Sequence, residues 1–307
     1  MTATPLEDIH LPPQAVAQLR DTEAAEWIDN HTIEVRRSWW TTTLEEHGFD
    51  DTLVGDTISR AEIFALSGPA AESPDAALTL LWNSLAWGSG SKRRKNRARI
   101  ASVARNRETA TALLQQAARC SRRDPGEAYS LLYPDNRTAI RQLGPAFFTK
   151  YLYFAGGGSS DHQCCILDEN VALALQKTCG WHSLPSRSWL ATAYARYAVL
   201  LGRWVNEHEL DRPDVIERWL FEEGKRLRMT ASTVSPKPAR IADAVPAVEP
   251  AEPDGTCFCG CGEATSDGKF FVTSHDRRAE SRAIRERFGD IATFVAWSEK
   301  HLPRIGG

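Results

Sequence analysis

Residues 139–175 read AIRQLGPAFFTKYLYFAGGGSSDHQCCILDENVALAL, and the interpretation of the whole chain depends on this stretch. An apolar segment ends in Leu143-Gly144-Pro145, where glycine permits a tight turn and proline suits the first turn of a helix. Residues 146–155 then carry aromatic and aliphatic side chains at helical spacings. The stretch therefore predicts a helical hairpin over residues 139–155.

A carboxylate stands at a second transition in the same stretch. Three glycines at 156–158 lead to the apolar run CCIL at 164–167, which is followed directly by Asp168 and by a new helical pattern. A carboxylate at such a position caps the helix by accepting the unpaired N–H groups of its first turn. It can also serve chemistry, and the residues alone leave both interpretations open.

The combination of hairpin, glycine break and apolar run ending in Asp168 resembles the helix-hairpin-helix DNA glycosylases, in particular the 8-oxoguanine DNA glycosylase-like group. The resemblance extends over residues 61–227 in helix content, and its motif over residues 143–172. It implies that the turn Gly144-Pro145-Ala146 presents backbone N–H groups to a DNA phosphate. It also implies that Asp168 is the catalytic carboxylate of an enzyme that flips out a damaged or modified base and breaks its N-glycosidic bond.

Two positions depart from the family's pattern. Its turn usually reads Gly-apolar-Gly, whereas this chain has Gln142-Leu143-Gly144. Members that cleave the DNA strand carry a nucleophilic lysine just after the second glycine, where this chain has Ala146. Lys150, one helical turn further on, is either a solvated lysine or an amine nucleophile on the same helix face. We therefore expect hydrolysis without strand cleavage, with Lys150 as the alternative nucleophile.

The composition is that of a globular protein. The 307 residues, 42% hydrophobic and 25% charged, suffice for a full core and a small second module. No apolar run is long enough to span a bilayer, so no membrane partner is expected. The N-terminal MTATPLEDIH has no signal-peptide pattern, and the seven cysteines do not form a secreted disulfide framework. We expect a cytoplasmic protein, associated with the nucleoid if it acts on DNA.

One segment is strongly basic although the formal net charge is −3. Residues 92–99, KRRKNRAR, hold six basic side chains in eight positions: Lys92, Arg93, Arg94, Lys95, Arg97 and Arg99. A basic run is often only a solvated loop. Here the acidic residues lie mainly in 21–51 and 207–254, which favours a segregated basic face for the phosphates of double-stranded DNA.

Helical periodicity continues on both sides of the hairpin, and no convincing set of alternating strands interrupts it. Helices are predicted over residues 76–87, 96–120, 188–207 and 213–228. Ser59-Arg60-Ala61-Glu62 has the pattern of a helix capping box. The predicted fold class is all-α, a helical bundle with a helix-hairpin-helix element. The predicted organisation is a helical leader over 1–58, a glycosylase-like domain over 59–228, a Pro/Ala-rich linker over 229–256 and a small module over 257–307.

The C-terminal module begins with three cysteines, Cys257, Cys259 and Cys261, and reaches His275 after one expected hairpin. Three thiolates and an imidazole are a complete tetrahedral ligand set for a structural Zn²⁺. A module of about fifty residues buries too little apolar surface to fold unaided, so a metal is physically expected. The module resembles the short zinc ribbons and zinc knuckles of nucleic-acid-binding proteins. The alternative is three reduced cysteines in a flexible tail.

Two classes of function remain. The first is a DNA N-glycosylase of base excision repair, a hydrolase. The second is a DNA-binding protein that keeps the hairpin fold but has lost catalysis. Release of a base from duplexes that carry damaged or modified bases would separate them.

Overall fold

The apolar helix α5 (Pro74–Ser89) lies at the centre of the larger part of the structure. Most of its helix contacts are with α4 (Ser67–Glu72), α7 (Arg107–Ser121) and α9 (Pro145–Phe154). Ser73 begins α5, because its hydroxyl accepts a hydrogen bond from the N–H of Ala76 and Pro74 occupies the first helical position. The helix is buried on almost every side, which explains its run of leucine, alanine and tryptophan.

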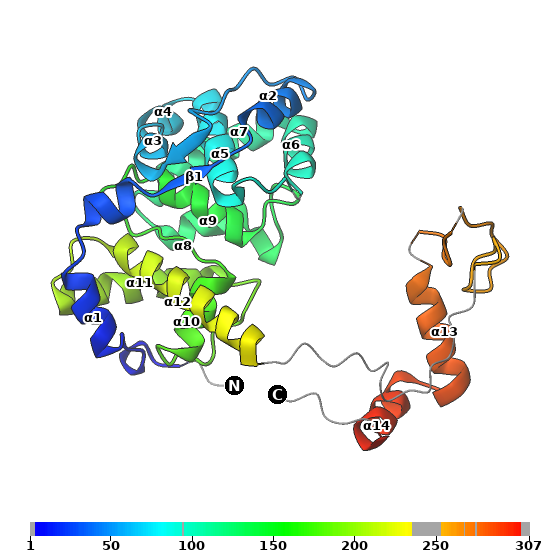
Figure 1. Cartoon of the computed structure of the whole chain (residues 1–307). Helices are drawn as coiled ribbons and strands as arrows, with labels where there is room; N and C mark the ends of the chain where they lie inside the picture. Colours follow the sequence, from blue (N-terminus) through cyan, green and yellow to red (C-terminus); the bar gives the residue numbers. More distant parts are fainter. Residues whose placement is uncertain (1–3, 94, 235–252, 267, 274, 302–307) are drawn as a thin grey trace. The chain divides into compact units, whose positions relative to one another are not determined.

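The computed structural model describes residues 4–93, 95–234, 253–266, 268–273 and 275–301 (Figure 1). The chain divides into two compact units, residues 1–229 and residues 230–307. Residues 235–252 of the linker predicted over 229–256 lie outside the described residues. None of the described helices combines the length and the apolar composition that a membrane crossing requires.

The fold-class prediction of an all-α protein is confirmed. The other α-helices and the strands described in the first unit are α1 (Pro13–Arg20), β1 (Thr32–Glu34), α2 (Arg37–Glu45), β2 (Thr57–Ser59), α3 (Arg60–Phe64), α6 (Asn96–Arg105), α8 (Pro125–Leu132), α10 (Glu169–Lys177), α11 (Ala191–His208) and α12 (Pro213–Val234). Short helical turns lie at Leu6–Asp8, Ala25–Asp29 and Pro134–Asn136. The two short strands pair antiparallel, with Ile33 opposite Ile58. They contribute little to a unit whose core is made by helices.

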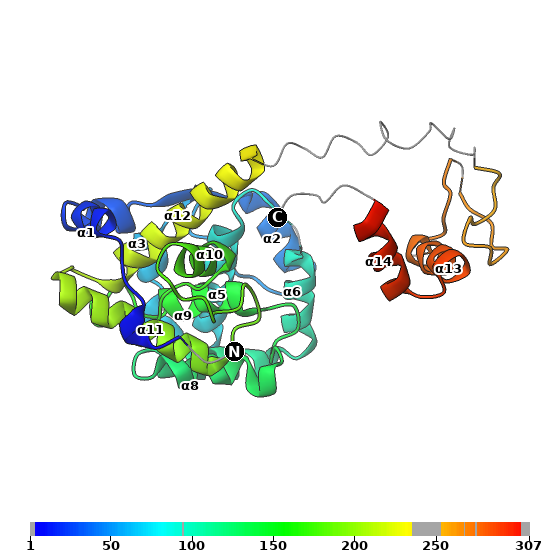
Figure 2. The ribbon, with the colours of Figure 1, turned by 90° about the horizontal axis from the view of Figure 1, so that it is seen from below.

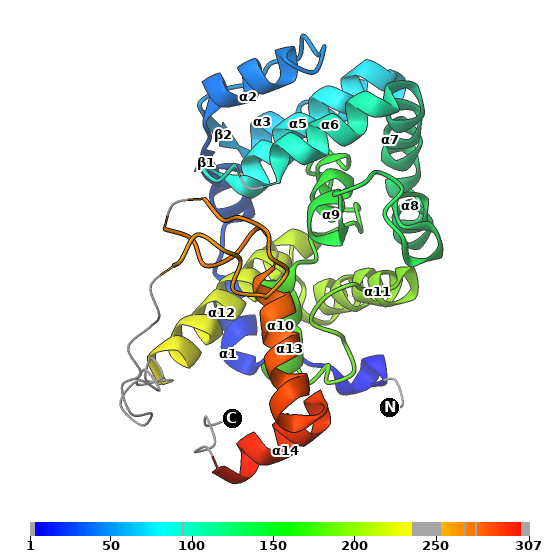
Figure 3. The same cartoon turned by 90° about the vertical axis from the view of Figure 1, so that its right-hand side faces the viewer.

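The first unit has two halves (Figures 1 and 3). Helices α2 to α7 form one half, α1 and α10 to α12 form the other, and α8 and α9 lie between them. The leader predicted over residues 1–58 contributes to the same core, since Ile9, Leu19 and Ile28 are buried in it. Arg203 of α11 also donates one hydrogen bond to the carbonyl of Ile9 and one to the carbonyl of Leu6. The N-terminal segment is therefore part of this unit.

One predicted helix is broken and one predicted cap is present. The helix predicted over 96–120 is wrong as a single element, because α6 and α7 meet at Asn106, whose φ of −137° and ψ of 52° are not helical. Asparagine is common at helix ends because its side chain competes for backbone hydrogen bonds.

The capping box is confirmed: Ser59 Oγ accepts from the N–H of Glu62, and the Glu62 carboxylate accepts from the N–H of Ser59.

The first half of the predicted helical hairpin differs from the prediction. Its second helix is α9, but residues 137–144 form turns, and the helix before them is α8. Asp135, Asn136 and Gln142 all have positive φ, a conformation that a right-handed helix excludes. The helix pair is thus α8 and α9, joined by residues 133–144.

The second unit consists of a cysteine-rich loop and two helices, α13 (Asp276–Phe288) and α14 (Ile291–His301). The ring of Phe288 contacts the rings of Phe294 and Trp297, and these aromatic contacts join the two helices. Among the residues of this unit that the structure describes, only Cys257 and Cys259 are buried. Apolar burial alone therefore gives this unit little stability.

In the first unit, α12 crosses the beginning of α10 (Figure 2) at a glycine. A Cβ placed on Gly224 would lie 2.1 Å from the carbonyl oxygen of Asn170. Real Cβ atoms do not approach a backbone oxygen so closely, and a backbone atom cannot swing aside as a side chain can. Gly224 therefore sets the distance between the two helices.

We predict that Gly224→Ala lowers the free energy of unfolding by about 1–3 kcal/mol, because the added methyl group forces α12 away from α10. The matched control is Gly202→Ala in α11, where the new Cβ meets no atom within 4 Å. That change should raise the free energy of unfolding by about 0.5–1 kcal/mol, since glycine weakens a helix interior. Urea unfolding measures both variants, and a Gly224→Ala protein as stable as the wild type would contradict the close packing.

Candidate functional site

A cavity of about 320 Å³ lies within the first unit and is lined by residues of both halves. Its walls come from α3, α5, α9, α12, the residues next to β1 and the segment before α10. Its charged and polar lining includes His31, Arg60, Lys150, Asp168, Glu217 and Lys225. Trp87 and Phe221 supply aromatic surface. The fold thus gathers ionisable and aromatic groups from distant parts of the sequence around one space.

Asp168 uses its two carboxylate oxygens in different ways. Oδ1 accepts hydrogen bonds from the N–H groups of Asn170 at 2.9 Å and Val171 at 3.2 Å, and so caps α10. Oδ2 lies 3.6 Å from Nζ of Lys150. The capping interpretation is therefore correct for one oxygen, and the other oxygen faces an ammonium group at the cavity.

Lys150 is buried, with 9% of its side chain exposed, so it is not a solvated surface lysine. Its Nζ donates a hydrogen bond to the carbonyl oxygen of Ala146 at 2.8 Å, one turn back along α9. The stem of the side chain passes over Gly88, where a Cβ would lie 2.6 Å from Cδ of Lys150. The absence of a side chain at Gly88 therefore leaves room for Lys150 to reach Asp168.

The sequence patterns did not identify a second pair of charges in the wall of the cavity. Nη1 of Arg60 lies 3.1 Å from Oε2 of Glu217, and both side chains are buried. Arg60 also donates to the hydroxyl of Tyr153 at 2.7 Å and lies over the ring of Trp87. The available signal was Glu217 itself, an acidic residue three and four positions before the apolar pair Leu220 and Phe221.

Burial raises the pKa of Glu217 to about 7, and the nearby charge of Asp168 adds to this effect while Arg60 opposes it. Burial lowers the pKa of His31 to about 3, with a further contribution from the positive charge of Arg60. The imidazole is therefore neutral at physiological pH. Within the described chain, Nδ1 of His31 and Nε of Arg60 are buried without a hydrogen-bond partner. The cavity wall thus holds polar atoms whose hydrogen bonds are not used internally.

The turn before α9 is open at its glycine. Gly144 has an ordinary φ of −83°, and a Cβ there would meet no atom within 4 Å. The protein's own packing therefore does not require glycine at this position. Pro145 and Ala146 form the first turn of α9, where backbone N–H groups have no partner within the helix. The geometry leaves space beside a helix N-terminus, which favours an anion.

The basic run has two kinds of residue. Three of its side chains are exposed: Lys92, Arg93 and Lys95. Arg97 is exposed too and forms an ion pair with Glu46. Arg99 is buried and donates to the carbonyl oxygen of Gln142, so it is not a surface cation. Arg94 lies outside the described residues.

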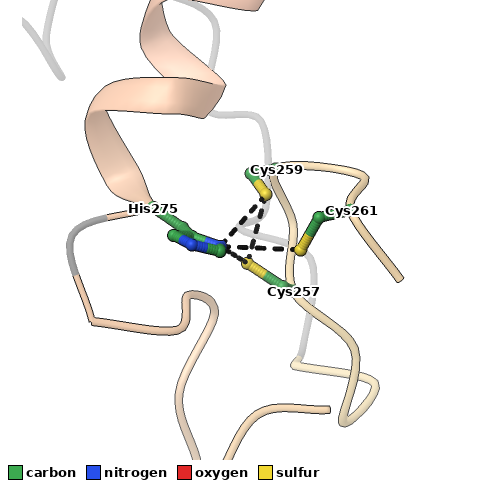
Figure 4. Close-up of side chains that lie close together, drawn as sticks. All are labelled: Cys257, Cys259, Cys261 and His275. Carbon is green, nitrogen blue, oxygen red and sulfur yellow. Dashed lines mark hydrogen bonds between the residues drawn. The ribbon is translucent and has the colours of Figure 1, made fainter. Parts of the chain in front are cut away.

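Cys257, Cys259, Cys261 and His275 form a cluster in the second unit (Figure 4), and their ligand atoms all lie within 4.8 Å of one another. The three sulfur atoms are 3.5–3.6 Å from Nδ1 of His275. Positive φ at Gly260 lets the loop fold back between its cysteines. Three sulfurs and one imidazole nitrogen converging on one point could hold a tetrahedral metal ion.

Comparison with known proteins gives one match. Residues 26–221 match the model of the family described as "Putative 8-oxoguanine DNA glycosylase OGG-like protein". No curated protein and no solved structure matches the chain. The matched span contains every residue of the cavity up to Phe221, and the Cys3His cluster lies outside it.

The pKa of Glu217 predicts a pH dependence of stability. In the folded protein, the Glu217 carboxyl keeps its proton up to about pH 7. In the unfolded chain the same carboxyl has the ordinary pKa of 4.5, so it loses its proton at lower pH. Protonation of Glu217 therefore stabilises the folded protein fully below about pH 4.5, and this stabilisation is lost as the pH rises through about 7. Between pH 5 and 8 the free energy of unfolding of the wild type should fall, relative to Glu217→Gln, by on the order of 2 kcal/mol.

Urea unfolding at several pH values measures this difference. Glu222→Gln, on the same helix and about half exposed, is the control and should follow the wild-type profile. Parallel profiles for the wild type and Glu217→Gln would contradict the raised pKa.

Proposed function

The chain belongs to the OGG-like 8-oxoguanine DNA glycosylase family, and on this basis we propose that it binds duplex DNA, flips out one damaged or modified base and hydrolyses its N-glycosidic bond. The observation that carries the proposal is the pair formed by Asp168 and Lys150, 3.6 Å apart at the wall of a cavity. Oδ1 of Asp168 serves the cap of α10, whereas Oδ2 faces the Lys150 ammonium group at the cavity. The same cavity holds Glu217 and His31, whose pKa values are shifted by burial, and shifted ionisable groups gathered in a cavity are typical of active sites.

The cavity has the properties that a flipped base requires. Its volume of about 320 Å³ is in the range of small-molecule sites, and Trp87 and Phe221 offer aromatic faces. Arg60, His31 and Glu217 offer donors and acceptors for the polar edge of a base. We propose that the base occupies this space, with its sugar toward Asp168.

In the proposed reaction the bond between the base and C1′ of the sugar breaks, and its electron pair leaves with the base. The carboxylate of Asp168 stabilises the positive charge on the sugar. Water then bonds to C1′ and gives up a proton, which Asp168 accepts. The departing base takes up a proton from solvent, and Asp168 returns its proton to solvent. The products are the free base and an abasic sugar, and the DNA strand stays intact.

Lys150 is the alternative nucleophile, but its surroundings favour water. Nζ of Lys150 lies 3.6 Å from the Asp168 carboxylate and donates to the carbonyl oxygen of Ala146 at 2.8 Å, so it must give up both interactions before it can attack a sugar. The position at which strand-cleaving relatives carry their lysine, by the resemblance described above, is Ala146 here. We therefore propose that Lys150 orients the Asp168 carboxylate and that hydrolysis proceeds without strand cleavage.

We assign DNA contact to two surfaces. In the turn Gly144-Pro145-Ala146, the backbone N–H groups of Gly144 and Ala146 would donate to one phosphate, which can approach closely because no Cβ covers Gly144. Lys92, Arg93 and Lys95 are exposed and would attract neighbouring phosphates. Arg97 would have to leave Glu46 to do so.

A DNA-binding protein without catalysis is the second candidate. The observation that favours it is the cap, because Oδ1 of Asp168 would bond to Asn170 and Val171 whether or not the protein is an enzyme. Base release by the wild type, and its loss in the variant below, would exclude this candidate.

We predict that Asp168→Asn abolishes base release and leaves duplex affinity within about threefold of the wild type. The amide keeps the cap but cannot accept a proton or stabilise a cationic sugar. The free energy of unfolding should change by about 1 kcal/mol or less. Base release is measured on oligonucleotides with single modified bases, such as 8-oxoguanine, by strand breakage after hot alkali.

The matched control is Asp124→Asn. Asp124 caps α8 through a hydrogen bond from the N–H of Glu127, as Asp168 caps α10, and it does not line the cavity. This variant should keep full activity. Full activity in Asp168→Asn would leave Asp168 as a helix cap in a DNA-binding bundle. Borohydride trapping of a DNA adduct, lost in Lys150→Gln, would instead identify Lys150 as the nucleophile.

We also propose that the Cys3His cluster holds one structural Zn²⁺. Its four ligand atoms suit zinc, and the described part of the second unit has almost no other buried side chains. The ion would contribute folding energy to that unit and take no part in base release.

Metal analysis should therefore find about one zinc per chain in the wild type. Cys259→Ala should lose it, because three ligands do not complete the tetrahedron. The control is Cys179→Ala, which removes a buried cysteine of the first unit and should retain the zinc. A wild-type protein purified without any bound metal would contradict the proposed site.

A further inference from the structure

Gln142 adopts a backbone conformation that suits glycine. Its φ is +69°, in the left-handed region, and it lies two residues before Gly144. A side chain with a Cβ is strained there, so the surrounding structure must hold the residue in place. Gln142 itself is exposed, so its side chain is not what anchors it.

Arg99 supplies the anchor. Its Nε donates a hydrogen bond of 3.1 Å to the carbonyl oxygen of Gln142. Another of its nitrogens, Nη1, donates to Oδ1 of Asn96, and the amide of Asn96 donates to Ser89 Oγ at 3.0 Å. The turn is thus connected through Arg99 to the start of α6 and the end of α5.

A second contact fixes the same guanidinium. It lies 3.6 Å from the centre of the Phe147 ring, in the first turn of α9. Arg99 is therefore attached to the backbone before Gly144 and to a side chain after it. Four residues lie between these attachments, and the last three of them, Gly144, Pro145 and Ala146, form the turn that we assign to a phosphate.

The electrostatic state of Arg99 is unusual for a residue of the basic run. Only 5% of Arg99 is exposed, and burial lowers its pKa to about 10, so it is charged at neutral pH. Among the described residues, no carboxylate forms an ion pair with it. Burying a cation is costly unless it is hydrogen-bonded, and here the acceptors are the Gln142 carbonyl oxygen and Oδ1 of Asn96.

We propose that Arg99 is a positioning residue that holds Gln142 in its left-handed conformation and thereby shapes the Gly144-Pro145-Ala146 turn for phosphate binding. The DNA part of this inference rests on the proposed function, whereas the conformational part does not. Arg99 acts through the turn and does not contact DNA. It follows that the need for Arg99 depends on Gln142, since glycine adopts the left-handed conformation without support.

The experiment is a double-mutant cycle with Arg99→Met and Gln142→Gly. Methionine keeps an apolar stem against Phe147 but has no N–H donor. Duplex affinity is measured by fluorescence anisotropy at several salt concentrations. Arg99→Met should weaken binding about tenfold in the wild-type background, Gln142→Gly alone should change it less than about twofold, and the double variant should recover most of the loss.

The salt dependence separates positioning from direct contact. Arg93→Gln removes an exposed charge and should lower the slope of log affinity against log salt by about one unit, whereas Arg99→Met should leave the slope unchanged. An equal loss in both backgrounds with a reduced slope would mean that Arg99 contacts phosphate, and this would overturn the inference. Unchanged affinity in Arg99→Met would overturn it too.

Hydrogen exchange of the amides of residues 142–144, 146 and 147 tests the conformational part without DNA, since Pro145 has no amide hydrogen. Exchange should be about tenfold faster in Arg99→Met and return to the wild-type rate when Gln142→Gly is added. Equal rates in all variants would overturn the inference. If the wild type binds no duplex, the proposed function fails, and the exchange rates alone decide the role of Arg99. If Arg99→Met does not fold, Arg99→Lys replaces it, since lysine lacks the fork that joins Gln142 to Asn96.

Discussion

The site depends on one carboxylate that serves two helices. Asp168 caps α10 with Oδ1 and faces Lys150 of α9 with Oδ2. Because the cap fixes the carboxylate plane, the position of Oδ2 is set by the start of α10 and not by a freely rotating side chain. A group held in this way loses little entropy when a substrate arrives, which is how a catalytic carboxylate is pre-organised. The structural and the proposed catalytic interpretations of Asp168 therefore support each other.

Around this carboxylate the cavity balances several charges. Arg60 and Glu217 are buried as a pair, which is costly unless each group also has other partners, and Arg60 finds them in Tyr153 and the ring of Trp87. Burial and the positive charge of Arg60 lower the pKa of His31, so its imidazole is neutral. In the reaction that we propose, a base entering the cavity would meet fixed dipoles and charges in place of water. This arrangement would strengthen any interaction with the charge that develops as the glycosidic bond breaks.

Local patterns in the sequence predicted the features that depend on neighbouring residues. The capping box at Ser59 and the apolar face of α5 follow from spacing alone. Contacts between distant segments could not be predicted in this way. Nothing near Arg99 in the sequence indicates that it hydrogen-bonds to Gln142. A basic run predicts exposed side chains, and the pattern is the same although its last residue, Arg99, is buried. The pairing of Arg60 with Glu217, 157 positions apart, is invisible for the same reason.

Two glycines show why the geometry of the site exceeds what residue types can indicate. Gly88 leaves space for the stem of Lys150, and Gly224 lets α12 approach Asn170, two residues after Asp168. Neither has a positive φ, so neither is required by its own backbone. Each glycine is required because a Cβ at its position would displace an atom of a segment that is distant in the sequence. Asp168 and Lys150 therefore owe their positions to glycines on neighbouring helices, which leave the space that a side chain would fill. Only the packed structure shows this.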